Sequence, residues 1–268
     1  MRHGLATLAV AAIGLAVFAG IAGADTVSPI DFESPAYSPG TINGQQGWQK
    51  TGPYDANVVD LSSYPAAAGY GFGSQALQIS DATTSGSFGD QTFSPGLADP
   101  AGEEAKRHFA ATFKIGTATA AQQLGLHLSV SPDSGEGSRM SYLRFEDQSD
   151  GVHVFFDDVT DPGPLGTVAD FNETDIATIK RGQAHLVLLS IDFKPGPHND
   201  KVKVWIDGRL EANGTTWEDY YRYDPEQAGN GNQVPNVNTV LFRESGTPTP
   251  LNLGQGFLVD DLTYGSSK

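Results

Sequence analysis

Short runs of alternating apolar and polar residues recur along this chain, and clusters of turn residues separate them. In Lys201–Ile206, the side chains of Val202, Val204 and Ile206 fall on one face, and polar or aromatic side chains fall on the other. The next two residues, 207–208, are Asp-Gly, which tolerates the positive φ of a tight hairpin turn. With 32 glycines, 16 prolines and almost no helical periodicity, the chain is predicted to be an all-β, two-sheet antiparallel sandwich.

The same alternation and the turn clusters between runs predict where the strands lie. We expect strands at 28–32, 76–80, 108–115, 124–130, 140–146, 151–157, 184–193, 201–206, 239–243 and 257–264. At most one or two short helices are expected, at 172–179, where Asn172 could cap, and at the acidic, alanine-containing piece 100–106.

Residues 1–24 have the composition of a secretory signal peptide. The apolar run 5–21 carries no charge and follows a short basic start, and the Ala-Gly-Ala at 22–24 is a small-residue cleavage site. We expect cleavage after Ala24, secretion, and a single domain in residues 25–268, because no repeat or linker-like run divides them. A retained membrane anchor is the alternative. The chain has no cysteine, so packing, or packing together with a metal, must stabilise it.

The chain is strongly acidic, with 32 acidic against 16 basic residues and a net charge of −16. Nucleic acids and anionic membrane surfaces bind proteins through basic patches that release counterions. We therefore expect no nucleic-acid partner and, after removal of the signal peptide, no membrane partner. The charge is typical of a solvated extracellular protein, and carboxylates could also hold Ca²⁺.

Several predicted strands carry one core face and one polar face. In 124–130 the leucines and the final valine point one way and His127 points the other, while in 140–146 Tyr142 and Arg144 share the polar face. If the polar faces of neighbouring strands lie on one concave sheet, they form a ligand groove. If they lie on the convex side, they are only solvated, and the sequence leaves both arrangements open.

A dense aromatic and charged segment follows the predicted hairpin. Aromatic rings can stack on sugars, and carboxylates or guanidinium groups can bind sugar hydroxyls. The candidate carbohydrate-binding residues are Trp217, Glu218, Asp219, Tyr220, Tyr221, Arg222 and Tyr223. The alternative is that these rings only cover the core near a sheet edge.

Motifs in a fixed order along the chain resemble a known superfamily. These motifs are Asp-Phe-Glu at 31–33, Asn-Gly-Gln-Gln-Gly-Trp at 43–48, Gly-Ser-Gln-Ala-Leu-Gln-Ile at 73–79, Val-Lys-Val-Trp-Ile-Asp-Gly at 202–208 and Phe-Leu-Val-Asp-Asp-Leu at 257–262. The mature chain resembles the concanavalin A-like lectin and glucanase superfamily, and in particular the laminin-G-like jelly-roll modules of secreted bacterial-type proteins. Shorter galactose-binding-like modules are the second choice. The resemblance implies a jelly roll and an extracellular glycan or polysaccharide as partner.

The resemblance also implies a structural metal. In jelly rolls the first and last strands commonly pair, which would bring Glu33 near Asp260 and Asp261. Carboxylates at this place hold Ca²⁺ in some members of the superfamily. Full ligation needs about six to eight oxygens, so backbone carbonyls would have to contribute.

Most catalytic signatures are absent from the sequence. Glucanases of this superfamily carry E-x-D-x-E on a strand, whereas the one E-x-D here, Glu173 to Asp175, lacks the second Glu and lies in a segment predicted to be helical. There is no G-x-S-x-G, H-E-x-x-H or P-loop. Jelly-roll polysaccharide lyases use a His or Tyr base with a cation that neutralises the uronate, and His127, Tyr142 and Arg144 are residues of these types.

Three functional hypotheses follow from these observations. The first is a secreted, lectin-like protein that recognises a glycan without cleaving it, through the aromatic segment. The second is a polysaccharide lyase or an atypical glycosidase. The third is a structural or adhesive surface module without a small ligand.

Overall fold

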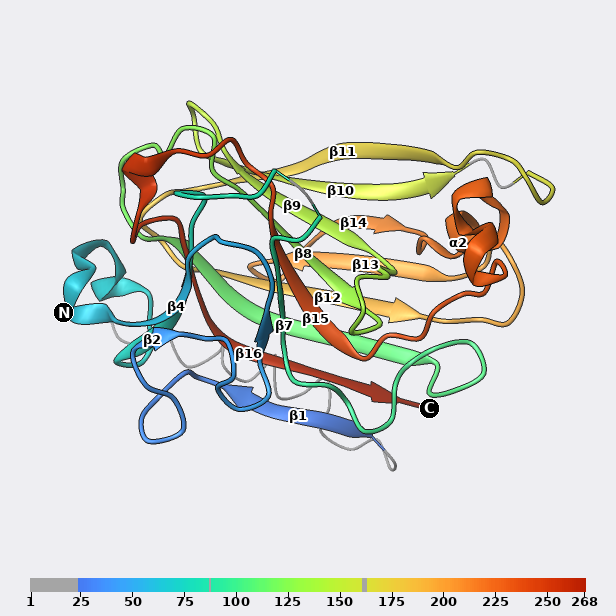
Figure 1. Ribbon diagram of the computed structural model, residues 1–268, viewed down its shortest axis with the longest axis horizontal. Helices are drawn as coiled ribbons and strands as arrows, with labels where there is room; N and C mark the ends of the chain where they lie inside the picture. Colours follow the sequence, from blue (N-terminus) through green and yellow to red (C-terminus); the bar gives the residue numbers. More distant parts are fainter. Residues whose placement is uncertain (1–23, 87, 161–162) are drawn as a thin grey trace.

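The computed structural model describes residues 24–86, 88–160 and 163–268. Two antiparallel sheets pack face to face (Figure 1), which confirms the predicted two-sheet sandwich. The predicted signal peptide lies outside the described residues, apart from its last residue, Ala24. Within the described part of the chain, no helix has the length and apolar character needed to cross a bilayer.

The larger sheet, called sheet A, has nine strands. In spatial order they are β14 (Arg209–Gly214), β13 (Lys201–Ile206), β12 (His185–Asp192), β7 (His108–Thr117), β16 (Phe257–Ser267), β5 (Gln75–Ile79), β4 (Ala56–Asp60) and β2 (Gly40–Thr41), and β1 (Asp25–Ile30) also pairs with β16. The pairing of β1 with β16 joins Val27 to Tyr264 and Ile30 to Leu262. The first and last strands are thus neighbours, as the resemblance implies.

The smaller sheet, called sheet B, has seven strands. In spatial order they are β11 (Asp170–Ile179), β10 (Val152–Thr160), β9 (Tyr142–Asp147), β8 (His127–Asp133), β15 (Thr239–Glu244), β6 (Gln91–Phe93) and β3 (Gln49–Lys50). The described helical segments are short: η1 (Leu61–Ser63), η2 (Pro65–Gly69), α2 (Glu218–Tyr223), η3 (Pro225–Asn230) and η4 (Pro250–Asn252). Strands β2, β3, β4, β6, β11 and β14 are not among those that the sequence predicts.

Aromatic rings fill the space between the two sheets. Phe113 of β7 meets Phe145 of β9 and Phe242 of β15, with ring centroids 6.3 Å apart in both pairs and nearly perpendicular rings. Phe145 also lies 6.2 Å from Phe257 of β16. Edge-to-face pairs of this kind contribute about 0.5–1.5 kcal/mol each beyond the burial of their area. The apolar faces predicted from alternation are therefore the faces that join the sheets.

The hairpin predicted at Asp207-Gly208 connects β13 to β14. Both residues have positive φ, 52° and 80°, as a tight turn requires. After β14 the chain reaches Trp217, whose backbone N–H donates to the carbonyl of Met140 at 3.0 Å. This bond holds the start of α2 against sheet B.

The predicted helix at 172–179 is wrong, because these residues belong to β11. They pair with β10 along its length, from Val152 opposite Ile179 to Asp158 opposite Asn172. The segment contains four β-branched residues, which favour a pleated strand over a helix: Thr174, Ile176, Thr178 and Ile179. The available edge of β10 outweighs the weak helical pattern.

The second predicted helix, at 100–106, is wrong as well. This piece is a turn in which Ala101 bridges to both Lys106 and Val237. The N–H of Gly102 donates to the carbonyl of Lys106 at 2.8 Å. A glycine so close to the start, and a segment of barely two turns, leave a helix here unstable without tertiary contacts.

Candidate functional site

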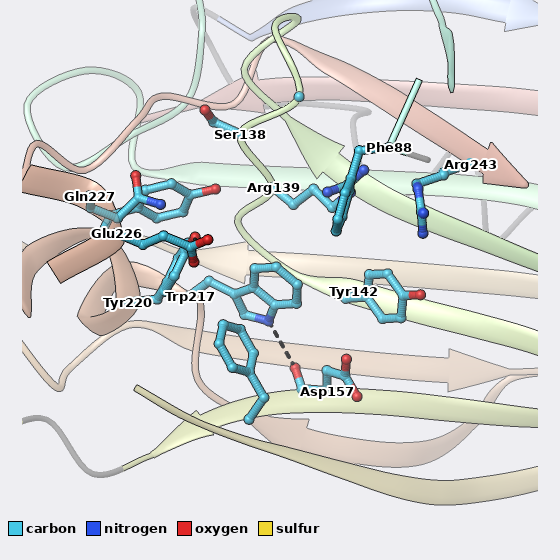
Figure 2. A pocket seen from close by; sticks show the side chains of 13 residues that line it. Phe88, Ser138, Arg139, Tyr142, Asp157, Trp217, Tyr220, Glu226, Gln227 and Arg243 are labelled. Atoms are coloured by element: carbon cyan, nitrogen blue, oxygen red, sulfur yellow. Dashed lines mark hydrogen bonds between the residues drawn. The ribbon is translucent and has the colours of Figure 1, made fainter. Parts of the chain in front are cut away.

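An open groove of about 410 Å³ lies on the outer face of sheet B, beside α2 (Figure 2). Tyr142, Asp157 and Arg243 reach it because their neighbours along the strands, such as Phe156 and Phe242, point into the core. The lining residues are Phe88, Gly137, Ser138, Arg139, Tyr142, Asp157, Phe171, Trp217, Tyr220, Tyr221, Glu226, Gln227 and Arg243.

The indole of Trp217 lies at the centre of the groove in a fixed orientation. Its Nε1 donates to the carbonyl of Asp157 at 3.2 Å. One face stacks on Tyr142, with centroids 5.7 Å apart and planes 21° apart, and Phe171 packs edge-on at 4.9 Å. Two rings and one hydrogen bond therefore set the plane of a partly buried aromatic platform.

Two arginines and one phenylalanine form the wall above this platform (Figure 2). The exposed ring of Phe88 lies over both guanidinium groups, 5.6 Å from Arg139 and 4.4 Å from Arg243. Arg139 is only 6% exposed, and its Nε and Nη2 are buried without a hydrogen-bond partner among the described residues. Burial lowers the pKa of Arg139, and nearby Asp133 opposes that effect.

Asp157 supplies a carboxyl group on the other side of Trp217. It is opposite Tyr142 on β9 and Glu173 on β11. Burial, and next the charge of Glu173, raise the pKa of Asp157 to about 6. One of its oxygens, Oδ1, is buried and accepts no hydrogen bond from the described residues. The groove thus offers an acceptor and, across the platform, donors.

The predicted aromatic segment divides between the groove and the protein interior. Trp217, Tyr220 and Tyr221 line the groove, and the other four residues of the segment do not. Glu218 and Asp219 are buried, and Tyr223 stacks on His198 at 5.6 Å. The segment is a short helix, α2, rather than a loop.

Arg222 anchors α2 from inside. Its guanidinium bonds Glu103 and, at 3.1 Å, Glu218. One oxygen each from Glu103, Glu218 and Asp200 lies within 4.8 Å of the others, a spacing that a metal could use. Every oxygen of these carboxylates already accepts a hydrogen bond, for example from the hydroxyl of Thr216 to Asp200 at 2.8 Å. The group is an internal network whose cation is Arg222.

The three lyase candidates lie on the same outer face of sheet B, but only Tyr142 lines the groove. His127 Nε2 is 3.5 Å from Glu146, and burial lowers the pKa of His127. Arg144 bonds Glu146 and Glu173. The guanidinium of Arg144 is thus paired with carboxylates of the protein itself. In Tyr142, burial raises the pKa of the phenol.

Two of the three predicted calcium ligands meet at one glycine. Asp260 Oδ2 accepts from the N–H of Gly73 at 3.3 Å, and a Cβ on Gly73 would lie 2.0 Å from Glu33 Oε1. Asp260 is fully buried, its Oδ1 has no partner among the described residues, and burial raises its pKa to about 7. Asp261 instead pairs with Lys114 at 2.6 Å. Asp260 thus keeps one free oxygen, whereas both oxygens of Glu33 already accept hydrogen bonds from Ser74 and Gln75, and calcium stays a prediction.

Sequence reasoning missed the wall of the groove. Arg139 and Phe88 come from segments between strands, and only the fold brings them together. Arg243 and Asp157 could have been found as polar positions on the outward faces of their strands, since both alternate with core phenylalanines.

No model of a known protein family matches this sequence, and no curated protein matches it. Solved structures do match this chain in their fold. An alginate lyase mutant in complex with an alginate trisaccharide matches at 12% identity and a TM-score of 0.51, over 91% of this chain and 99% of that one. A sialidase matches at 13% identity and a TM-score of 0.50, over 91% of this chain and 18% of the sialidase.

An endo-β-1,4-glucuronan lyase from the fungus Trichoderma reesei matches at 12% identity and a TM-score of 0.48, over 86% of this chain and 94% of that one. At such identities the similarity concerns the fold, and function must be argued from the site. The chain has the concanavalin A-like β-sandwich fold that the order of its sequence motifs implies.

Proposed function

We propose that the groove on sheet B binds a carbohydrate chain, and that the protein recognises this glycan without cleaving it. The observation that carries the proposal is the Trp217 platform, whose plane is set by Tyr142, Phe171 and the carbonyl of Asp157. Sugars present a flat apolar face with hydroxyls at its rim. A fixed indole bordered by donors and acceptors suits both parts of such a ligand.

The polar groups around the platform support the same ligand. Arg139 and Arg243 are donors, Asp157 and Glu226 are acceptors, and the hydroxyl of Tyr220 donates to Glu226 at 3.0 Å. These side chains point into an open groove rather than a closed cavity, so a chain longer than one sugar can lie along it. The volume is within the range of small-molecule sites. The alginate lyase with this fold holds a trisaccharide, which supports a saccharide as ligand class.

The experiment compares two tryptophans on opposite sheets. Trp217→Ala should weaken glycan binding by about 1 kcal/mol or more, because the stacking surface is lost. Trp205→Ala is the matched control, since Trp205 is also partly buried but lies on β13 of sheet A, opposite Leu188 and Leu210. Binding is screened on a glycan array and measured by calorimetry below the melting temperature of both variants.

The melting temperature of Trp217→Ala cannot by itself show whether Trp217 binds the ligand. Because Trp217 packs against Tyr142 and Phe171, its removal should also lower the melting temperature, and stability alone does not separate a platform from a core residue. Equal affinity in Trp217→Ala and Trp205→Ala would refute the platform. Absence of binding to any glycan by the unmodified protein would refute the function.

A further inference from the structure

Resting on the proposed function, we infer that the glycan is acidic and that a sugar carboxylate binds the edge of Arg139 in the groove. The ligand class is thus an oligosaccharide containing uronic acid. Nothing in the fold alone requires an acidic ligand, because the sandwich hosts many kinds of site. The inference comes from the donors that Arg139 presents.

Arg139 presents two donors on a single edge of its guanidinium. Its Nε and Nη2 are both buried and lack a hydrogen-bond partner among the described residues, although the residue is only 6% exposed. Leaving buried donors of a charged group unpaired costs more than leaving neutral donors unpaired. Two parallel N–H donors match the two oxygens of a carboxylate.

The same pair of atoms binds a carboxylate elsewhere in this chain. In Arg144, Nε and Nη2 lie 2.7 and 2.6 Å from Oε1 of Glu173. Arg144 is therefore satisfied by the protein, whereas Arg139 lines the groove and its equivalent edge has no partner among the described residues. The contrast assigns the anion to Arg139 rather than to Arg144.

The charges around the groove set the direction of the sugar. Arg243 adds a second positive charge beside Arg139, under the same Phe88 ring. Asp133 is near Arg139, but its Oδ1 accepts from Gly135 and Gly137, and its Oδ2 accepts no hydrogen bond from the described residues.

Two carboxylates oppose an anion elsewhere in the groove. Asp157 and Glu226 line it away from the arginine wall, and Figure 2 shows Asp157 across Trp217 from Arg139. An anionic group is thus favoured at the wall of Arg139 and repelled at Asp157. The sugar carboxylate should face Phe88, and its hydroxyls should face Asp157.

The test compares oligouronates with the same oligosaccharides after chemical reduction of their carboxyl groups, by calorimetry on the full chain. The uronate form should bind about tenfold more tightly, since hydrogen bonds to charged groups contribute about 1.5 kcal/mol or more. Arg139→Gln should abolish this preference, so that the uronate form binds no more tightly than the reduced form. Arg139→Lys keeps the charge without the two-donor edge, and it replaces the Gln variant in the test if that variant does not fold. The Lys variant should lose most of the preference. Arg209→Gln on β14, far more exposed, is the control for net charge and should keep the preference.

Each outcome decides between the inference and the proposed function. Equal binding of uronate and reduced forms, or a preference that survives in both Arg139 variants, overturns the acidic ligand and leaves glycan binding intact. Tighter binding of sulfated neutral sugars than of uronates overturns the carboxylate as the anion. No binding of either form, with Trp217→Ala indistinguishable from the unmodified protein, rejects the proposed function itself.

Discussion

Asp260→Asn should change how stability depends on pH. Asp260 is fully buried with a pKa raised to about 7, against an ordinary value of 3.8. A carboxyl group with a raised pKa stabilises the folded state below its unfolded pKa, and this stability is lost as pH rises through the folded value. From about pH 8 to pH 5, linkage from Asp260 alone adds ~2.5 kcal/mol to the free energy of unfolding, or roughly 5–10 °C in melting temperature.

The assay is thermal unfolding in EDTA at several pH values, for the unmodified protein and the variant. Other acids whose pKa burial raises to about 6, such as Asp81 and Asp157, contribute in both proteins and cancel in the difference. The variant should be at least as stable as the unmodified protein at pH 8 and should gain less stability at pH 5. A less stable variant with a parallel pH profile would show that the charge of Asp260 is compensated in the fold, and would refute the reasoning.

Calcium provides a second measurement on the same residue. If Glu33 and Asp260 hold Ca²⁺, added calcium should raise the melting temperature of the unmodified protein at pH 8 by mass action. Asp260→Asn should abolish this rise. Asp261→Asn is the matched control and should keep it, because Asp261 is paired with Lys114. An unmodified protein that melts at the same temperature with and without calcium would remove the metal while leaving the pH argument intact.

Two further predictions concern the rest of the site. Arg222→Met should destabilise the protein by about 3 kcal/mol, since it leaves Glu103 and Glu218 close together without their cation. Because Arg222 anchors α2, the variant should also bind the glycan more weakly. Chemical denaturation measures the stability and calorimetry the binding, and unchanged stability would contradict the anchoring role. Oligouronates incubated with the protein should give no absorbance of an unsaturated product, because the donors of Arg144 are bound to other side chains; product that disappears in Tyr142→Phe would establish a lyase instead.

The fold could be predicted from local patterns because its core faces alternate cleanly. Strands such as β13 and β9 bury every second residue, so periodicity identifies both the strand and its inner face. Strand β11 escaped because it is an edge strand, largely exposed, whose residues need not alternate. Its strand character comes from its partner β10, which local sequence does not reveal.

The site was predictable only in part, for a similar reason. Trp217 and the tyrosines near it could be found because aromatic residues are dense in this short stretch of sequence. Arg139 matters because its donors are buried without partners, a property that depends on the packing of Phe88 and the neighbouring strands. Likewise, the sequence around Arg222 suggests a sugar-binding residue, yet its side chain bonds Glu103, which lies more than a hundred positions earlier.

Strand β11 also bears on how the protein behaves at high concentration. It is ten residues long and forms the outer edge of sheet B, where unpaired backbone groups can recruit a strand from another molecule. Asp170, Glu173 and Asp175 place carboxylates along this edge, and Arg144 compensates the charge of Glu173 only in part. Two copies approaching edge to edge would oppose like charges, so these carboxylates act as a barrier to aggregation. Replacing them with neutral residues should make the protein associate through this edge, most readily in high salt, where the remaining repulsion is screened.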